Sequence, residues 1–233
     1  MHSVDLQTFS GSVAERGWAV TPPIVSDSTI EQLRAAVCTL ARDGHGGARN
    51  LLDLQEVQSL ARSEAVRGLA IAVLGEACFA TRALLFDKTP EANWKVIWHQ
   101  DLTVAARARA DASGYGPWSE KASVPHVQPP MAVLESMLAI RIHLDPCGIE
   151  NGPVRVLERS HRLGHVSVET IDALRRDLAE TNCLVEQGGA LAFRPLILHA
   201  SAPSTVPHHR RVIHLEFAAT ELAPLLEWHR RIA

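Results

Sequence analysis

Two parts of the chain that lie far apart in the sequence carry residues able to bind one metal ion together. In the H-x-D tripeptide that begins at His99, the imidazole and the carboxylate of Asp101 are two residues apart. A strand has a period of two residues, so both side chains lie on one face of a strand. His199, at the end of the apolar run 191–198, offers a second imidazole. Two histidines and one carboxylate predict a non-haem Fe(II) centre, because this ligand set leaves coordination positions open.

By itself an H-x-D tripeptide is weak evidence for a metal centre. The chain contains twelve histidines, so such a tripeptide can arise by chance and form a hydrogen-bonded pair on the surface. The iron interpretation therefore depends on the rest of the sequence.

Five motifs, in their order and spacing, resemble the phytanoyl-CoA dioxygenase family over essentially the whole chain. They are Phe86-Asp87-Lys88-Thr89-Pro90, Trp98-His99-Gln100-Asp101, Glu150-Asn151-Gly152-Pro153-Val154-Arg155-Val156, Ser160-His161-Arg162-Leu163-Gly164, and His199-Ala200-Ser201 followed by Arg210-Arg211. The resemblance implies a mainly β (α+β) fold, a cupin-like double-stranded β-helix or jelly roll, with N-terminal helices packed on one sheet. It also implies iron near one mouth, with 2-oxoglutarate and O2 as cosubstrates.

The resemblance further implies which residues bind 2-oxoglutarate. Arg210 matches the arginine that pairs with its far carboxylate, Ser201 matches a serine that hydrogen-bonds the same group, and Lys88 matches a lysine that often lies nearby. A guanidinium suits this task, because its planar fork fits a carboxylate and it stays charged.

Strand parity leaves Arg211 as an alternative to Arg210. Arg211 shares its face with the apolar residues Ile213, Leu215 and Phe217, so parity by itself turns Arg210 toward solvent. We expect Arg210 to face the cosubstrate nevertheless, with a bulge or twist at the first residue of the strand.

Three residues are candidates for contact with the substrate. Arg141 lies on the polar face of the alternating segment 133–145, and this face either lines a cavity or meets solvent. Trp98 adjoins His99. Trp118 lies in the segment 103–130, which is rich in glycine and proline and is predicted to be a long loop or lid over the pocket.

The resemblance also bears on the reaction. Related iron halogenases have a small residue at the carboxylate position, so Asp101 implies hydroxylation, or a similar oxidation, of a small molecule with release of succinate and CO2. Two alternatives remain open: a cupin-like metal enzyme of another class, such as a hydrolase or isomerase, and a catalytically silent metal-binding relative. The serine and arginine after His199 favour the oxygenase over a zinc enzyme.

Apolar spacing and turn residues predict the elements that position these residues. A first helix is expected after a cap at Ser26 or Asp27, with apolar residues at helical spacing over 30–40 and a stop near Gly44-His45-Gly46-Gly47. Two further helices are expected over Val57 to Leu74 and over Val168 to Leu178. Strands are expected over 82–87, 94–99, 133–145, 153–157, 190–199 and 210–219.

Length and composition predict a single domain over residues 1–233, which the resemblance implies is a dioxygenase domain. A formal charge of −3, with scattered Lys and Arg, predicts no nucleic-acid and no membrane partner. The N-terminus has no signal-peptide pattern, and no stretch approaches eighteen apolar residues, so a cytoplasmic enzyme of small-molecule substrates is expected. The four cysteines form no C-x-x-C pair, and the sequence leaves the oligomeric state open.

Overall fold

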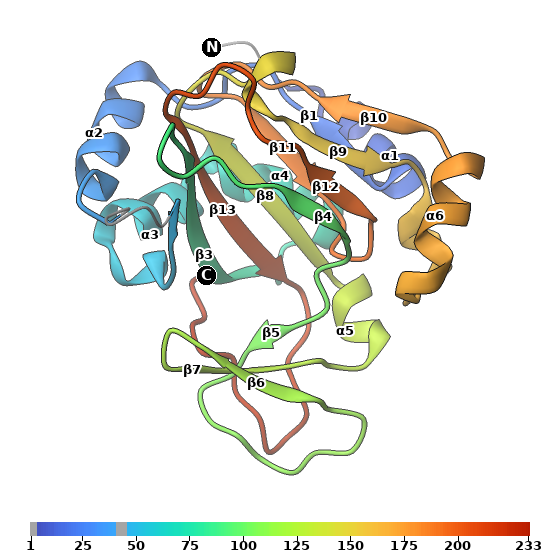
Figure 1. Cartoon of the computed structure of the whole chain (residues 1–233). Coiled ribbons are helices and arrows are strands. Elements are labelled where there is room, and N and C mark those ends of the chain that lie inside the picture. Colours follow the sequence, from blue (N-terminus) through green and yellow to red (C-terminus); the bar gives the residue numbers. More distant parts are fainter. Residues whose placement is uncertain (1–3, 41–45) are drawn as a thin grey trace.

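The computed structural model describes residues 4–40 and 46–233. Two antiparallel sheets face each other at its centre (Figure 1), which confirms the predicted jelly roll. The larger sheet has the strand order β1 (Trp18–Val20), β11 (Ala190–Phe193), β8 (Met137–His143), β13 (Arg210–Ala218), β3 (Phe79–Lys88) and β2 (Gly47–Ala48). The smaller sheet has the order β10 (Glu180–Cys183), β9 (Val154–Leu157), β12 (His199–Ser201) and β4 (Val96–His99).

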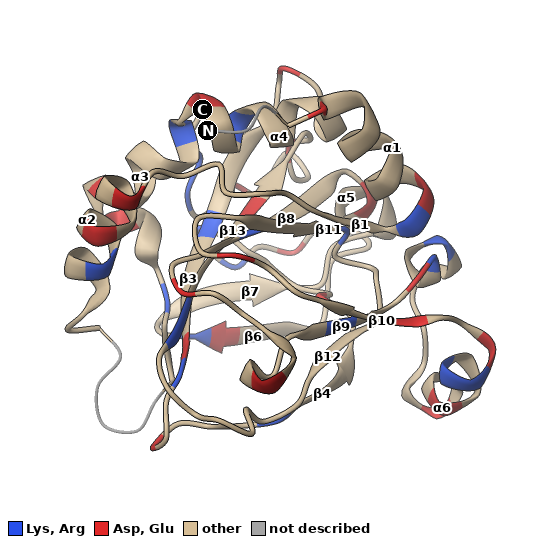
Figure 2. Ribbon diagram, turned by 90° about the horizontal axis from the view of Figure 1, so that it is seen from above, with Lys and Arg blue, Asp and Glu red and all other residues tan. Residues whose placement is uncertain are grey.

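A layer of N-terminal helices covers the outer face of the larger sheet, as Figure 2 shows. These helices are α1 (Leu6–Arg16), α2 (Asp27–Val37), α3 (Gln55–Arg62) and α4 (Glu64–Leu74). Ile30, Leu33 and Val37 lie at helical spacing and are buried in one cluster with Ile140 and Leu215 of the sheet. The prediction that these helices pack on one sheet is therefore confirmed. No helix in the described ranges is long and apolar enough to cross a membrane.

Capping residues decide where these helices begin and end. Ser26 caps α2 by accepting a hydrogen bond from the Thr29 N–H group, as predicted. The helix ends at Val37, so the predicted stop near Gly44-His45-Gly46-Gly47 is too late. Gly44 and His45 themselves lie outside the described residues. The single helix predicted over residues 57–74 is wrong, because Ser63 ends α3 and caps α4.

Two predicted strands are divided in the structure. The strand expected over 190–199 is split into β11 and β12, and residues 194–198 carry the chain from the larger sheet to the smaller one. Pro195 lies in this crossover and has no N–H group for a sheet ladder. The segment 133–145 begins with a short helix, α5 (Met131–Glu135), before β8. Elements that the sequence analysis did not predict include α1, β1 and β10.

The segment 103–130 contains a small sheet, so the prediction of one long loop or lid is wrong for these strands, although residues 107–117 have no helix or strand. Its strands are β5 (Val104–Ala105), β7 (Val124–Val127) and β6 (Trp118–Lys121), and they lie below the larger sheet in Figure 1 beside the C-terminal segment. Val104 and Val127 are buried in a cluster with Phe79 and Trp228. The remaining helical elements are η1 (Leu51–Asp53), η2 (Ile149–Asn151), η3 (Ser160–Leu163) and α6 (Val168–Asp177).

Candidate metal centre

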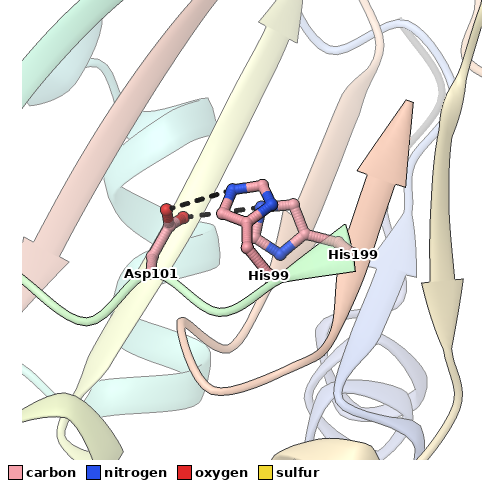
Figure 3. Close-up of side chains that lie close together, drawn as sticks. All are labelled: His99, Asp101 and His199. Atoms are coloured by element: carbon pink, nitrogen blue, oxygen red, sulfur yellow. Dashed lines mark ion pairs between the residues drawn. The ribbon is translucent and has the colours of Figure 1, made fainter. Parts of the chain in front are cut away.

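The smaller sheet places His99 and His199 opposite each other. His199 is the first residue of β12 and the register partner of His99, the last residue of β4, and their ring centroids are 4.2 Å apart. The carboxylate of Asp101 lies 3.8 Å from His99 Nε2 and 3.7 Å from His199 Nε2 (Figure 3). One ligand atom from each residue lies within 4.8 Å of the others. The structure thus brings the three predicted metal ligands together.

Backbone hydrogen bonds determine which nitrogen of each imidazole faces the site. Nδ1 of His99 lies 2.8 Å from the carbonyl oxygen of Ile97, and Nδ1 of His199 lies 3.0 Å from that of Ile197. A carbonyl oxygen can only accept a hydrogen bond, so Nδ1 carries the proton in both rings. Nε2 of each ring therefore keeps a lone pair that is available to a metal.

Burial and local charges keep the site in a protonation state that suits a metal. Burial lowers the pKa of His199 to about 4, so this ring is neutral at pH 7. Burial alone would raise the pKa of Asp101, but nearby groups, foremost His199, outweigh it and hold the pKa at about 2. A neutral imidazole and an ionised carboxylate can both bind a cation without first losing a proton.

Gln100 links the two segments that carry the candidate ligands. Its Nε2 donates to the carbonyl of Leu196 at 2.6 Å and to that of Gly164 at 2.8 Å, and its Oε1 accepts from the Val166 N–H group at 2.8 Å. Because the crossover that contains Leu196 leads directly to His199, these bonds tie the H-x-D tripeptide to the distal histidine. No role was predicted for Gln100 from the sequence.

The Ser160-His161 motif supports the same crossover. The buried Ser160 hydroxyl accepts from the Leu198 N–H group at 2.8 Å and donates to the Leu157 carbonyl at 2.7 Å. His161 lies against α1, with Nε2 3.3 Å from the Ala14 carbonyl oxygen. The motif is structural, and His161 is remote from the three candidate ligands.

A cavity of about 130 Å³ opens beside the candidate ligands and is lined by both sheets. Lys88 and Arg210 are register partners on β3 and β13 and both line it, with exposures of 0% and 3%. Lys88 Nζ donates to Ser201 Oγ at 2.7 Å and to the Ala202 carbonyl, and Arg210 donates to the Gly152 carbonyl. Lys88, Ser201 and Arg210, the three residues predicted to bind 2-oxoglutarate, therefore lie in one cluster.

Gly152 is required for this cluster to form. Its φ angle is +62°, and a Cβ atom there would lie 2.3 Å from the Ala202 carbonyl oxygen and 3.0 Å from Lys88 Nζ. Any other residue would therefore displace the lysine or the backbone beside it.

Strand parity did not predict which of Arg210 and Arg211 faces the cavity, because both faces of β13 are buried. Ile213 and Leu215 pack beneath the helices, whereas Arg210 faces the cavity together with His214. The pairing with β3 is regular from Arg210 onward, and its irregularity falls after Glu216. The bulge expected at the first residue of the strand is therefore wrong.

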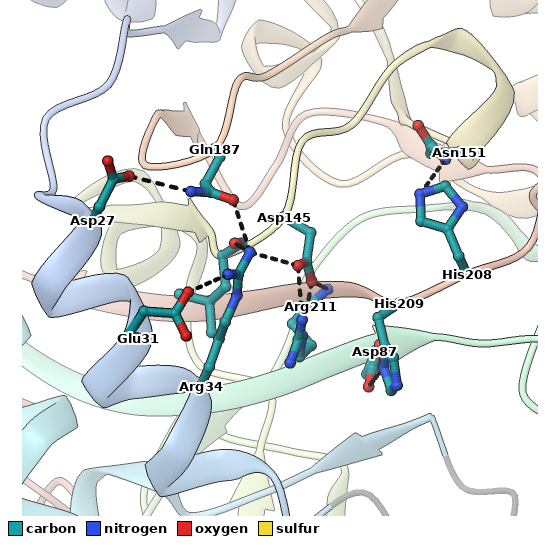
Figure 4. A network of polar contacts seen from close by, with 11 residues as sticks. Asp27, Glu31, Arg34, Asp87, Asp145, Asn151, Gln187, His208, His209 and Arg211 are labelled. Atoms are coloured by element: carbon teal, nitrogen blue, oxygen red, sulfur yellow. Dashed lines mark hydrogen bonds and ion pairs between the residues drawn. The ribbon is translucent and has the colours of Figure 1, made fainter.

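Arg211 belongs to a separate polar network outside the cavity (Figure 4). Its Nε and a terminal nitrogen each lie 2.8 Å from the carboxylate of Asp145, which also binds Arg34 at 2.8 Å. Helix α2 supplies Arg34, so this network ties the helix layer to the larger sheet.

Of the three predicted substrate residues, only Arg141 lines the cavity. It is 7% exposed, which excludes the alternative of a solvent-facing strand surface. Trp98 directly precedes His99 in a strand and is therefore on the opposite face of β4. The guanidinium carbons of Arg155 and Arg175 lie 5.3 and 5.5 Å from the centroid of its ring. Trp118 packs in the small sheet and does not line the cavity.

An ion pair that was not predicted from the sequence lies beside the centre. Arg82 and Glu216 are register partners on β3 and β13, and the Arg82 Nε atom lies 2.9 Å from the carboxylate. Nε2 of His214 lies 3.3 Å from the same carboxylate. The alternation of Arg210, His214 and Glu216 along one strand face was the available signal.

A comparison with protein-family models identifies the family. Residues 14–212 match the model described as phytanoyl-CoA dioxygenase. None of the curated proteins compared with the chain matches it significantly.

Solved structures with the same fold include iron and keto-acid enzymes. The structure of EctD from S. alaskensis with bound Fe has a TM-score of 0.71 at 17% identity, over 95% of this chain and 81% of that one. The epimerase SnoN in complex with Fe3+, alpha ketoglutarate and nogalamycin RO has a TM-score of 0.71 at 13% identity, over 91% and 83%. AviO1 from Streptomyces viridochromogenes Tue57 has a TM-score of 0.67 at 18% identity, over 96% and 99%.

At these identities the solved structures establish the fold, whereas the family model matches most of the sequence, including all three candidate ligands. The chain belongs to the phytanoyl-CoA dioxygenase family.

Proposed function

We propose that this chain is an Fe(II)- and 2-oxoglutarate-dependent dioxygenase that hydroxylates a small-molecule substrate. The observation that carries the proposal is the combination, in one cavity, of the His99, Asp101 and His199 ligand set with the buried cations Lys88 and Arg210. Two imidazole nitrogens and one carboxylate oxygen directed toward one point are a donor set that suits Fe(II) and leaves other positions free.

The two cations fit the far carboxylate of 2-oxoglutarate. Like charges directly opposite on neighbouring strands destabilise a sheet unless an anion lies between them, and Lys88 and Arg210 are such a pair. The guanidinium of Arg210 offers a fork to a carboxylate. Lys88 Nζ and the Ser201 hydroxyl, 2.7 Å apart, complete the set of donors.

When bound, iron and 2-oxoglutarate supply the oxidising chemistry with O2, and the keto acid leaves as succinate and CO2. The chain supplies the open ligand set, the orientation of the cosubstrate and the exclusion of water. Leu84, Phe86 and Val154 form apolar parts of the cavity wall. We further propose that residues 1–233 form one catalytic domain, since the cavity draws on strands from β3 to β13.

The two alternative functions, a metal enzyme of another class and a silent metal-binding relative, would require different residues in the cavity. A hydrolase or isomerase could use the three ligands, but it would have no need for buried cations beside Ser201. A silent metal-binding relative would have no need to keep the ligand atoms and these cations in one cavity. The cluster of Lys88, Ser201 and Arg210 therefore favours the dioxygenase.

Two measurements test the proposal. Anaerobic addition of Fe(II) and 2-oxoglutarate is expected to give the weak visible charge-transfer band of the chelate, and its absence would contradict cosubstrate binding. A substrate screen that follows succinate then identifies the small molecule. Hydroxylation adds one oxygen atom to the product, whereas epimerisation, named for SnoN, leaves its mass unchanged.

A further inference from the structure

Arg141 is a buried cation with no polar partner among residues 4–40 and 46–233. It projects from β8 into the cavity, and its guanidinium has no hydrogen bond or ion pair with any residue that the structure describes. The ring of Phe86 packs against it, with the guanidinium carbon 5.0 Å from the ring centroid. The guanidinium is thus held in place on an aromatic face while its hydrogen-bond donors remain unused.

The other two buried cations of the cavity are already held by oxygen atoms. Lys88 binds Ser201 and a backbone carbonyl, and Arg210 binds the Gly152 carbonyl. Burial is the main cause that lowers the pKa of Arg141 to about 10, and the positive charge of Arg210 adds to this effect. Arg141 is still protonated at neutral pH, so its burial is costly unless an anion binds.

A count of charges shows that iron and 2-oxoglutarate do not supply this anion. Arg82 and Glu216 neutralise each other, and the two positive charges of Fe(II) balance the two negative charges of 2-oxoglutarate. The remaining charges of the cavity are the cations Lys88, Arg141 and Arg210 and a single carboxylate, Asp101. At least one positive charge therefore remains, even where Lys88 is neutral.

The position of Arg141 in the sheet separates it from Arg210. Arg141 is the register partner of His214, which is four residues along β13 from Arg210. Four residues span about 13 Å of strand. The side chains of Arg141 and Arg210 therefore leave the sheet at different positions along the strand direction. A carboxylate of 2-oxoglutarate bound to Arg210 leaves Arg141 free to bind a carboxylate of another molecule.

We propose that Arg141 binds a carboxylate of the substrate, and that the enzyme therefore acts on an anionic small molecule. The inference rests on the proposed function, because the charge count assumes bound Fe(II) and 2-oxoglutarate. A carboxylate fits because the planar guanidinium can donate two parallel hydrogen bonds to it.

The test compares the wild type with Arg141→Met, Arg141→Lys and a control, Arg155→Met, whose arginine lies outside the cavity against Trp98. Each protein is loaded anaerobically with Fe(II) and titrated with 2-oxoglutarate, using the visible band. The loaded proteins are then titrated with a panel of aliphatic and aromatic monocarboxylic acids and with the primary amide of each acid, using the change in the same band. Thermal unfolding confirms that each variant is folded.

The expected result separates the two carboxylate sites. The 2-oxoglutarate constant of Arg141→Met stays within about threefold of the wild-type value, since Arg210 is intact. At least one acid binds the wild type and the control tenfold or more tightly than its amide does. This preference disappears in Arg141→Met and is partly kept in Arg141→Lys, which retains the charge but not the fork.

Three other results would overturn the inference. A tenfold or larger rise in the 2-oxoglutarate constant of Arg141→Met would assign this guanidinium to the cosubstrate, with the proposed function intact. A wild type that binds no acid of the panel more tightly than its amide would remove the carboxylate preference. A wild type that gives no chelate band would overturn both the proposed function and this inference.

Discussion

Gln100 Nε2 lies 2.6 Å from the carbonyl oxygen of Leu196, and this hydrogen bond joins the H-x-D tripeptide to the crossover before His199. The same side chain also binds Gly164 and Val166. Gln100 therefore acts as a positioning residue for the candidate ligands on either side of it, His99 and Asp101, and for the distal histidine.

Replacing Gln100 by Leu is expected to weaken the metal centre as well as the fold. The change leaves buried backbone groups without hydrogen-bond partners, which lowers the free energy of unfolding by about 1–3 kcal/mol. The loss of a hydrogen bond that supports the ligands typically lowers metal affinity by roughly 10–100-fold. Thermal unfolding and Fe(II) titration measure the two effects, and the visible spectrum of the Co(II) form reports the ligand geometry. Gln7→Leu, at an exposed position of α1, is the control. An unchanged metal affinity and spectrum, with reduced stability, would limit Gln100 to a structural role.

Removing a candidate ligand is expected to weaken Fe(II) binding sharply and to abolish turnover. His99→Ala, Asp101→Ala and His199→Ala each leave two of three donors, so Fe(II) affinity falls sharply and substrate-coupled succinate formation is lost. Anaerobic Fe(II) titration and a succinate assay provide the measurements. His165→Ala, at an exposed position, is expected to match the wild type. A double variant without His99 and His199 that still bound one iron and turned over would show that the metal is held elsewhere.

The two adjacent arginines are expected to differ in their effect on the cosubstrate. Arg210→Ala leaves the far carboxylate of 2-oxoglutarate without its buried partner. The binding free energy falls by about 3–5 kcal/mol, so the apparent dissociation constant of 2-oxoglutarate rises a hundredfold or more. Arg211→Ala breaks the contact with Asp145 outside the cavity, so its effect on this constant is small. Anaerobic titration with saturating Fe(II) decides between them. A reversed order would assign the cosubstrate to Arg211, and equal, negligible effects would remove it from both.

The affinity for 2-oxoglutarate is expected to fall above neutral pH because of Lys88. Burial, with Arg210 next in effect, lowers the pKa of Lys88 to about 7 in the free protein, and a bound anion raises it again. Below pH 7 the ammonium is present in both states, so the affinity is constant. Above pH 7 the free protein has lost the proton that the complex retains, so the dissociation constant rises by up to about tenfold per pH unit.

Titrations of 2-oxoglutarate between about pH 6 and pH 9 test this dependence. Lys88→Met is expected to bind the cosubstrate weakly and with a flat profile, while Lys95→Met, at an exposed position, keeps the wild-type slope. A flat wild-type profile, or a slope that persists in Lys88→Met, would show that another group titrates.

Features that depend on the spacing of neighbouring residues could be predicted before the structure was known. The period of a strand places His99 and Asp101 on one face, and helical spacing with the Ser26 cap predicts α2, because both follow from backbone geometry over a few residues. The order and spacing of the motifs led to the jelly roll, to His199 as third ligand, and to Lys88, Ser201 and Arg210 as neighbours. The apolar pattern over residues 57–74 continues across Ser63, so it predicted one helix. Ser63 caps α4 and divides the segment into α3 and α4, and the prediction of one helix was wrong.

Which face of each strand is enclosed depends on how the two sheets and the helices pack together. Alternation shows that two faces differ, but β13 is buried on both sides, one under the helices and one in the cavity, so parity could not choose between Arg210 and Arg211. The register between β4 and β12 brings His99 and His199 together from a hundred residues apart. The facing sheets leave Arg141 in the cavity without a polar partner in the part of the chain that the structure describes. Such contacts depend on how distant strands pair and pack, which no local pattern of residues specifies.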